Sequence, residues 1–178
     1  MINVEPENIE IKLPLNHNLN SGGKLYFNQL CKANYHPEKI HSVVISFLNN
    51  FQLRRNDFPL TKGSYSRTLL FRGQNRLELM IARWDQGTKT PIHGHPDFIY
   101  EYLLEGLFQI ESFKKKGYAV TKIANNIQQS GDVFSFRGLN GRFDNAIHRI
   151  TALKESLSLH IYSDDASKGE IFSRFETI

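Results

Sequence analysis

The sequence predicts a mainly β protein, a closed or sandwiched antiparallel β-barrel with helices at its N-terminal side. From about Tyr65 onward, short apolar-rich runs alternate with turn signals such as Gly73-Gln-Asn and Lys116-Gly117. That spacing is typical of antiparallel sandwiches and barrels. Before this point, apolar residues recur at intervals of three and four, which is the periodicity of a helix.

Two helices are predicted, over residues 23–33 and 37–51. Pro37 suits a first helical turn, and Ile40, Val44 and Phe47 follow it at helical spacing. We expect the first fifteen residues or so to form an extended arm. We also expect the helices to cap one end of the barrel.

Eight strands are predicted downstream, separated by glycine-containing turns. They are Tyr65–Phe71, Arg76–Trp84, Phe98–Leu104, Leu107–Phe113, Tyr118–Ile123, Asp132–Phe136, Ala146–Ala152 and Leu157–Ser163. The 178 residues suit a single domain. We divide it into an arm with helices (1–60), a barrel (61–165) and a C-terminal tail (166–178).

Composition excludes several classes of function. The net charge of +4 is spread along the chain, with no basic stripe, so we expect no nucleic-acid partner. The densest basic run, Lys114–Lys116, is typical of a solvated hairpin tip. No apolar run approaches the roughly 20 residues that span a bilayer, and we expect no signal peptide. Cys31 is the only cysteine, which excludes an internal disulfide and favours a cytoplasmic location.

His93 and His95 form the most informative pair. In a strand, residues i and i+2 face the same side, so these two imidazoles can share one metal ion. His148, in a later predicted strand, is the candidate third ligand. Three neutral imidazoles leave open metal positions, which indicates chemistry more than structural zinc. The alternative is a pair of surface histidines in a loop.

Alternation along 157–163 separates an apolar face from a polar face that carries Ser158, His160 and Tyr162. If the apolar face packs under helices or a second sheet, the polar row faces the interior. Buried hydroxyls and imidazoles need partners, so we predict a hydrogen-bonded Ser–His–Tyr row. The alternative is an ordinary strand with its polar face in water.

Tyr65 and Arg67 share one face of their predicted strand. A guanidinium that points into the barrel would bind an anion, and its planar fork suits a carboxylate. The alternative is an arginine on the surface of an edge strand. Trp84, the only tryptophan, is expected in the core or in a pocket wall.

These segments together resemble the cysteine dioxygenase family, iron thiol dioxygenases of the cupin superfamily. The resemblance covers roughly residues 60–165. It rests on Tyr65-Ser-Arg67, Pro91-Ile-His-Gly-His95, Asp144-Asn-Ala-Ile-His-Arg-Ile150 and Ser158-Leu-His-Ile-Tyr162. It implies a cupin-type antiparallel β-barrel, the double-stranded β-helix.

The resemblance also implies a site. Fe(2+) would be held by His93, His95 and His148. The substrate carboxylate would bind Arg67, with Tyr65 beside it.

In the same family, the active-site tyrosine matches Tyr162, which is hydrogen-bonded through His160 to Ser158. The implied reaction converts L-cysteine, or a related small thiol carboxylate, to the sulfinic acid with O₂. Three alternatives stay open: a dioxygenase for 3-mercaptopropionate or a larger thiol, a zinc or manganese cupin hydrolase or isomerase, and a non-catalytic metal- or ligand-binding cupin. The expected partners are the thiol and O₂, and the chain is expected to be a monomer.

The sequence departs from the family in three places. Some members carry a cysteine after the His-x-His that crosslinks to the tyrosine; residues 96–100 contain none, so we expect no thioether cofactor. Many cupins have a metal-binding glutamate in this region. The nearest candidate, Glu101, is offset from the usual place and is left out of the predicted ligand set. Tyr100 is bulkier than its counterpart and is expected to reshape the pocket.

Overall fold

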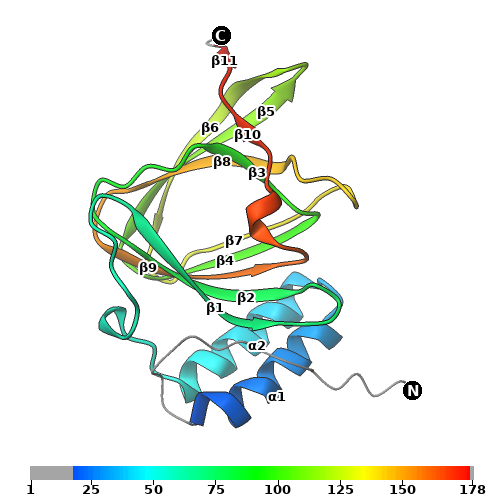
Figure 1. Cartoon of the computed structure of the whole chain (residues 1–178), viewed down its shortest axis with the longest axis vertical. Helices are drawn as coiled ribbons and strands as arrows, with labels where there is room; N and C mark the ends of the chain where they lie inside the picture. Colours follow the sequence, from blue (N-terminus) through cyan, green and yellow to red (C-terminus); the bar gives the residue numbers. More distant parts are fainter. Residues whose placement is uncertain (1–17, 177–178) are drawn as a thin grey trace.

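The computed structural model describes residues 18–176, which form two facing, mostly antiparallel sheets with two helices outside one of them (Figure 1). The mainly β fold class is confirmed. The extended arm expected for the first fifteen residues lies outside the described residues.

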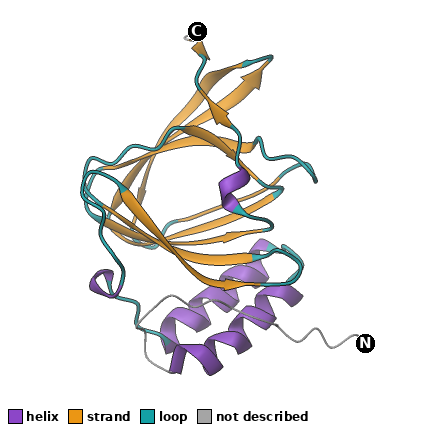
Figure 2. Ribbon diagram, viewed as in Figure 1, coloured by secondary structure: helices purple, strands orange, loops and turns teal. Residues whose placement is uncertain are grey.

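The elements follow one another as helices first and strands afterwards (Figure 2). The helices are α1 (Asn18–Lys32) and α2 (Pro37–Asn50), with short 3₁₀ turns η1 (Arg55–Asp57) and η2 (Ala166–Lys168). The strands are β1 (Tyr65–Arg72), β2 (Glu78–Trp84), β3 (Ile92–His95), β4 (Phe98–Glu105), β5 (Leu107–Lys116), β6 (Ala119–Gln129), β7 (Val133–Arg137), β8 (Asn145–Ala152), β9 (Ser156–Tyr162), β10 (Ile171–Phe172) and β11 (Phe175–Glu176).

The first sheet has the order β1-β2-β9-β4-β7, and the second has the order β10-β3-β8-β5-β6-β11. Successive strands from β2 to β5 therefore alternate between the two sheets, as in a double-stranded β-helix. Residues of both sheets meet in one interior cluster that includes Trp84, Leu103, Phe108 and Ile150. The two sheets thus enclose a common inside, which is the barrel that the sequence predicts.

The helices cover the outer face of the first sheet and do not cap an end of the barrel, so that expectation is wrong. Ile40, Val44 and Phe47 of α2 lie in one apolar cluster with Leu159 and Ile161 of β9. β9 lies between two other strands, so its apolar face would be exposed to water without the helices.

None of the helices within residues 18–176 is long and apolar enough to cross a membrane.

Tyr100 also faces the helices and not the pocket, which corrects the expectation that it reshapes the pocket. Its side chain is fully buried in the helix–sheet cluster, and its hydroxyl lies 2.8 Å from Nδ1 of His41 on α2. The neighbouring Ile99, with the opposite side-chain direction, packs against Tyr162 inside the barrel.

Three parts of the β region differ from the list of eight predicted strands. β3, the strand of His93 and His95, is absent from that list. β5 and β6 form a hairpin that turns at Gly117, as the basic run predicts, but β6 continues to Gln129 through polar residues that carry no strand pattern. The segment predicted as a C-terminal tail contains β10 and β11, which pair with β3 and β6. Two-residue strands are too short for any periodicity, so the sequence does not signal them.

Replacing Tyr100 by phenylalanine tests the outward placement. The change removes one buried hydroxyl and its hydrogen bond to His41, so we expect a loss of about 1 kcal/mol in the free energy of unfolding. Ligand affinity of the pocket should not change. Tyr102→Phe is the matched control because Tyr102 lies beside the same histidine ring. This substitution should change the free energy of unfolding little. A changed ligand affinity in Tyr100→Phe would place Tyr100 in the pocket after all.

Candidate metal centre

Two of the three predicted histidines lie on β3 and the third lies on the neighbouring strand β8. His93 lies opposite His148 in the register, whereas His95 lies opposite Asn145. The stretch of β8 between these pairs is one residue longer than that of β3, so β8 bulges, and Ala146 has a φ of 45°. The His95 and His148 rings lie together across this bulge although they are not register partners.

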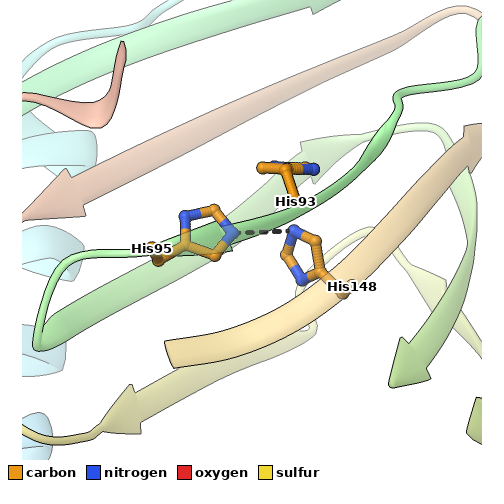
Figure 3. A group of neighbouring side chains, drawn as sticks. All are labelled: His93, His95 and His148. Atoms are coloured by element: carbon orange, nitrogen blue, oxygen red, sulfur yellow. Dashed lines mark hydrogen bonds between the residues drawn. The ribbon is translucent and has the colours of Figure 1, made fainter. Parts of the chain in front are cut away.

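The three imidazoles converge on one point (Figure 3). The Nε2 atoms of His95 and His148 are 3.0 Å apart, and the His93 ring centroid lies 4.7 Å and 4.9 Å from those of the other two. One nitrogen of each ring lies within 4.8 Å of the others. Nδ1 of His93 lies 3.0 Å from the carbonyl oxygen of Pro91. Because a carbonyl only accepts, Nδ1 carries the hydrogen, and Nε2 of His93 is left free to bind an ion.

This arrangement fits a metal ion. Metal–nitrogen bonds of about 2.1 Å place neighbouring ligands about 3 Å apart, which matches the separation of the His95 and His148 nitrogens. Burial lowers the pKa of all three rings, and that of His95 and His148 falls well below the usual value. Neutral imidazole is the form that binds metals. Within residues 18–176, no other His, Cys, Asp or Glu residues form such a group.

The histidines line a cavity of about 160 Å³. A cavity of roughly 150 Å³ holds a molecule as large as benzene, so this one suits a small ligand. Its other walls come from both sheets and from the C-terminal segment. The lining residues are Tyr65, Arg67, Met80, Ala82, Trp84, Thr90, Pro91, His93, His95, His148, Ile150, His160, Tyr162, Ala166, Ser167, Gly169 and Ile171.

Arg67 supplies the positive charge of this cavity. It lies on β1, remains exposed, and makes no hydrogen bond or ion pair with any residue between 18 and 176. No carboxylate is among the cavity-lining residues, so the guanidinium is available to an anion from solution. Tyr65, on the same face of β1, stacks on Trp84 with ring centroids 4.5 Å apart.

Ser158, His160 and Tyr162 form the hydrogen-bonded row that alternation predicts. Ser158 Oγ lies 2.6 Å from His160 Nε2, and Tyr162 Oη lies 3.0 Å from His160 Nδ1. Trp84 extends the row, because its Nε1 donates to Ser158 Oγ over 2.8 Å. Tyr162 in turn stacks on His95 at 5.5 Å, which joins the row to the histidine cluster.

The donors set the direction of this row. The Trp84 N–H can only donate, so Ser158 accepts from it. Ser158 is fully buried, and its other partner among the described residues is His160 Nε2, so the Ser158 hydroxyl donates there. His160 then carries its hydrogen on Nδ1 and donates it to Tyr162 Oη. The hydroxyl hydrogen of Tyr162 is thereby left free to point into the cavity.

Sequence reasoning left out one buried acid next to this row. Glu101 lies in register with His160 and is 1% exposed. Its Oε2 lies 3.6 Å from His160 Nδ1, and neither carboxyl oxygen has a hydrogen-bond partner among the described residues. A signal for it existed, because Glu101 is the only charged residue between Phe98 and Leu104.

The C-terminal segment 166–172, which we call the strap, closes one side of the cavity and braces β3. The Gly94 N–H donates to the Glu170 carbonyl oxygen over 2.8 Å, and the Glu170 N–H donates to the Phe143 carbonyl oxygen over 2.9 Å. Gly94 has no side chain, which leaves room for the Phe143 backbone. The Lys115 ammonium pairs with the Glu170 carboxylate at 2.8 Å. The histidine strand is therefore held between β8 and the strap.

The structure thus brings all eight predicted site residues to one cavity or to the row behind it. Ser158 alone does not line the cavity and reaches it through His160. Trp84 lies in the pocket wall, as expected. Cys31 lies on α1, which packs outside the first sheet. The contribution of the strap has no signal in the sequence.

No protein-family model and no curated protein matches the sequence. Solved structures with cupin-type barrels are similar in backbone. An RmlC-like cupin from Shewanella frigidimarina is 16% identical, covers 58% of this chain and 78% of its own, and has a TM-score of 0.44. A conserved protein with a double-stranded β-helix domain from Klebsiella pneumoniae is 11% identical, with 68% of this chain and 91% of its own chain covered and a TM-score of 0.49. A Bacillus subtilis oxalate decarboxylase variant is 20% identical, with 55% of this chain and 24% of its own chain covered and a TM-score of 0.43. The strand order given above carries the fold assignment: a cupin-type double-stranded β-helix.

The three-histidine cluster predicts one divalent metal ion per chain. Replacing any one of His93, His95 and His148 by alanine should lower metal affinity by at least about tenfold, since each supplies one ligand. Metal analysis of protein purified without chelators identifies the ion, and titration with Fe(2+) or Zn(2+) measures its affinity. His41→Ala, outside the barrel, is the control. Unchanged metal content in the three cluster variants would contradict the assignment.

Gly169→Ala tests the brace on β3. A Cβ at this position would overlap the Gly94 carbonyl oxygen, so the strap must move away from the histidine strand. We expect a destabilisation of about 1–3 kcal/mol and weaker metal binding. Thermal unfolding and metal titration measure both effects. Ser167→Ala lies in the same strap but creates no such overlap, so it should change neither the stability nor the metal affinity. If the two variants have the same stability and metal affinity, the strap does not support the histidine cluster.

Proposed function

We propose that this protein is an iron-dependent thiol dioxygenase that converts a small thiol carboxylate, with L-cysteine as the first candidate, to its sulfinic acid. One observation carries the proposal: a three-histidine cluster, an unpaired guanidinium and a tyrosine hydroxyl face the same small cavity. The resemblance of Tyr65-Ser-Arg67 and Ser158-Leu-His-Ile-Tyr162 to the cysteine dioxygenase family supports the choice of reaction.

The expected preference for an anionic substrate ligand follows from charge. His93, His95 and His148 are neutral, so the protein ligands do not compensate the charge of a divalent ion, and an anionic ligand such as a thiolate is favoured. Fe(2+) held by these residues would supply open positions for the thiolate and for O₂. Three imidazole ligands also suit zinc, which is why metal analysis comes first.

Arg67 is the proposed anchor for the substrate carboxylate. Its guanidinium is the unpaired cation of the cavity, and a bidentate contact would orient the thiol toward the histidine cluster. Tyr65, stacked on Trp84, narrows the space beside the anchor. Fixing the substrate in this way makes oxygen transfer effectively intramolecular.

Tyr162 would supply a hydrogen-bond donor to the bound substrate from the wall of the cavity. Burial raises the pKa of its phenol above the ordinary value, so it remains a neutral donor. Both atoms of O₂ end on the substrate sulfur, and the S–H hydrogen ends on the sulfinic acid. Sulfur supplies the electrons that reduce O₂, so no external reductant is required.

The test is aerobic incubation of the iron-loaded protein with L-cysteine, 3-mercaptopropionate, cysteamine and glutathione. We expect oxygen consumption and a mass gain of two oxygen atoms on a thiol that carries a carboxylate close to the sulfur. Cysteamine, which has no carboxylate, should be a poor substrate. No oxidation of any thiol by protein with full iron content would overturn the proposal, and a tightly bound zinc ion would favour the hydrolase alternative.

Arg67 variants test the anchor. Arg67→Ala should keep its iron but raise KM for L-cysteine by about 10- to 100-fold, because a hydrogen-bonded ion pair is lost. Arg67→Lys keeps the positive charge but loses the planar guanidinium that makes bidentate contacts. Its KM should lie between those of the wild type and Arg67→Ala. Steady-state oxygen uptake gives both constants. If Arg67→Ala retains the kinetics of the wild type, the carboxylate binds elsewhere.

A further inference from the structure

Glu101 is a buried acid that the proposed reaction does not use. It lies on β4 with its side chain inside the barrel, behind the cavity lining, and both carboxyl oxygens lack hydrogen-bond partners among the described residues. Buried polar groups are nearly always satisfied, so such an exception in the middle of a site needs an explanation. A leucine at this position would avoid the cost of burying a carboxyl.

The surroundings of Glu101 point to one partner. β9 presents His160, whose Nδ1 is 3.6 Å from Oε2, and Tyr162, which is within electrostatic range. β7 presents the apolar ring of Phe134 in register, and that ring lies 6.0 Å from His148 of the second sheet. Arg67 is the nearby cation and acts on both His160 and Tyr162. The ring N–H at His160 Nδ1 is therefore the polar hydrogen through which a Glu101 carboxylate can act on the row.

We propose that Glu101 is a positioning residue that acts through His160 to decide where Tyr162 directs its hydroxyl hydrogen. The inference deepens the proposed function, and rests on it only where it concerns turnover. Its basis is that Glu101 Oε2, at 3.6 Å, and Tyr162 Oη, at 3.0 Å, both lie near the same ring nitrogen, His160 Nδ1.

When Glu101 is ionised, its charge stabilises the hydrogen on His160 Nδ1. A carboxylate beside an imidazole fixes the tautomer in the same way in hydrolase triads. Nδ1 then donates to Tyr162 Oη, Nε2 accepts from Ser158, and the Tyr162 hydrogen points into the cavity.

When Glu101 is protonated, its O–H is a donor, and His160 Nδ1 is an acceptor 3.6 Å from Oε2. The imidazole hydrogen then moves to Nε2 and is donated to Ser158 Oγ, so the Ser158 hydroxyl hydrogen gives up the acceptor that it has in the ionised state. Tyr162 now meets a ring nitrogen that has no hydrogen to give and turns its own hydrogen back toward it. The cavity loses a donor. Burial raises the pKa of Glu101 to about 8, so both states occur close to neutral pH.

Trp84 reports these states directly. It is the only tryptophan, and its Nε1 donates to Ser158, whose second hydrogen bond reverses between the two states. We expect the fluorescence of the full-length, iron-loaded protein to show a transition between pH 7 and 9. Glu101→Gln, which keeps the shape and removes the ionisation, should abolish it. Glu101→Leu serves as a second variant, and the wild-type titration alone already overturns the inference if it shows no transition.

The kinetic test compares L-cysteine oxidation by the wild type and Glu101→Gln across pH. The ratio of their kcat values should rise from about one at pH 6.5 to about ten at pH 9, with similar KM values, because only the wild type gains the donor. A ratio cancels ionisation of the substrate thiol. In the Tyr162→Phe background the ratio should stay near one, while the fluorescence transition remains. A ratio that does not vary with pH overturns the inference.

Glu111→Gln is the matched control. Glu111 is also a largely buried acid, but it pairs with Arg149 and Lys122 and does not contact His160. Its variant should retain the fluorescence transition and the pH profile of the wild type. If a Glu101-dependent fluorescence transition is found but no thiol is oxidised, the inference stands and the proposed function fails. If thiols are oxidised and the transition persists in Glu101→Gln, the inference fails and the proposed function stands.

Discussion

The apolar contact between the two helices and the outer face of the first sheet allows the barrel interior to be polar. A central strand that is covered by helices can place all its apolar side chains outward, as Leu159 and Ile161 do. Its inward positions then need not supply the core. On β9 those positions carry Ser158, His160 and Tyr162, and each is satisfied by a neighbour in the row.

The site itself depends on small departures from regular strand geometry. The β8 bulge at Ala146 lies between the register positions of His148 and Asn145, directly beside the histidine cluster. Gly94 leaves space for the backbone of Phe143, while its N–H binds the strap. Bulges and close backbone approaches of this kind are common next to functional sites because they re-aim side chains on a rigid sheet.

Electrostatics divides the interior into two zones. At the cavity, Arg67 is charged and accessible, and the three histidines are kept neutral by burial. Behind it, Glu101 is an acid whose neutral form is favoured by the same burial. Arg67 and Glu101 both act electrostatically on Tyr162, and in the proposed mechanism Glu101 controls where this single hydrogen-bond donor points.

The sequence by itself determined which side chains share a strand face, because the side-chain period of two is a local property; the His93/His95 pair and the row on β9 could both be derived from it. Alternation could not assign the faces of β4, because apolar residues occupy both sides, and comparison of positions with the family alone put Tyr100 at the pocket and left Glu101 out of the ligand set. Only the tertiary structure decided that Glu101 lies beside His160 and that the strap closes the cavity. Both depend on the pairing of strands far apart in the chain, which no local pattern encodes.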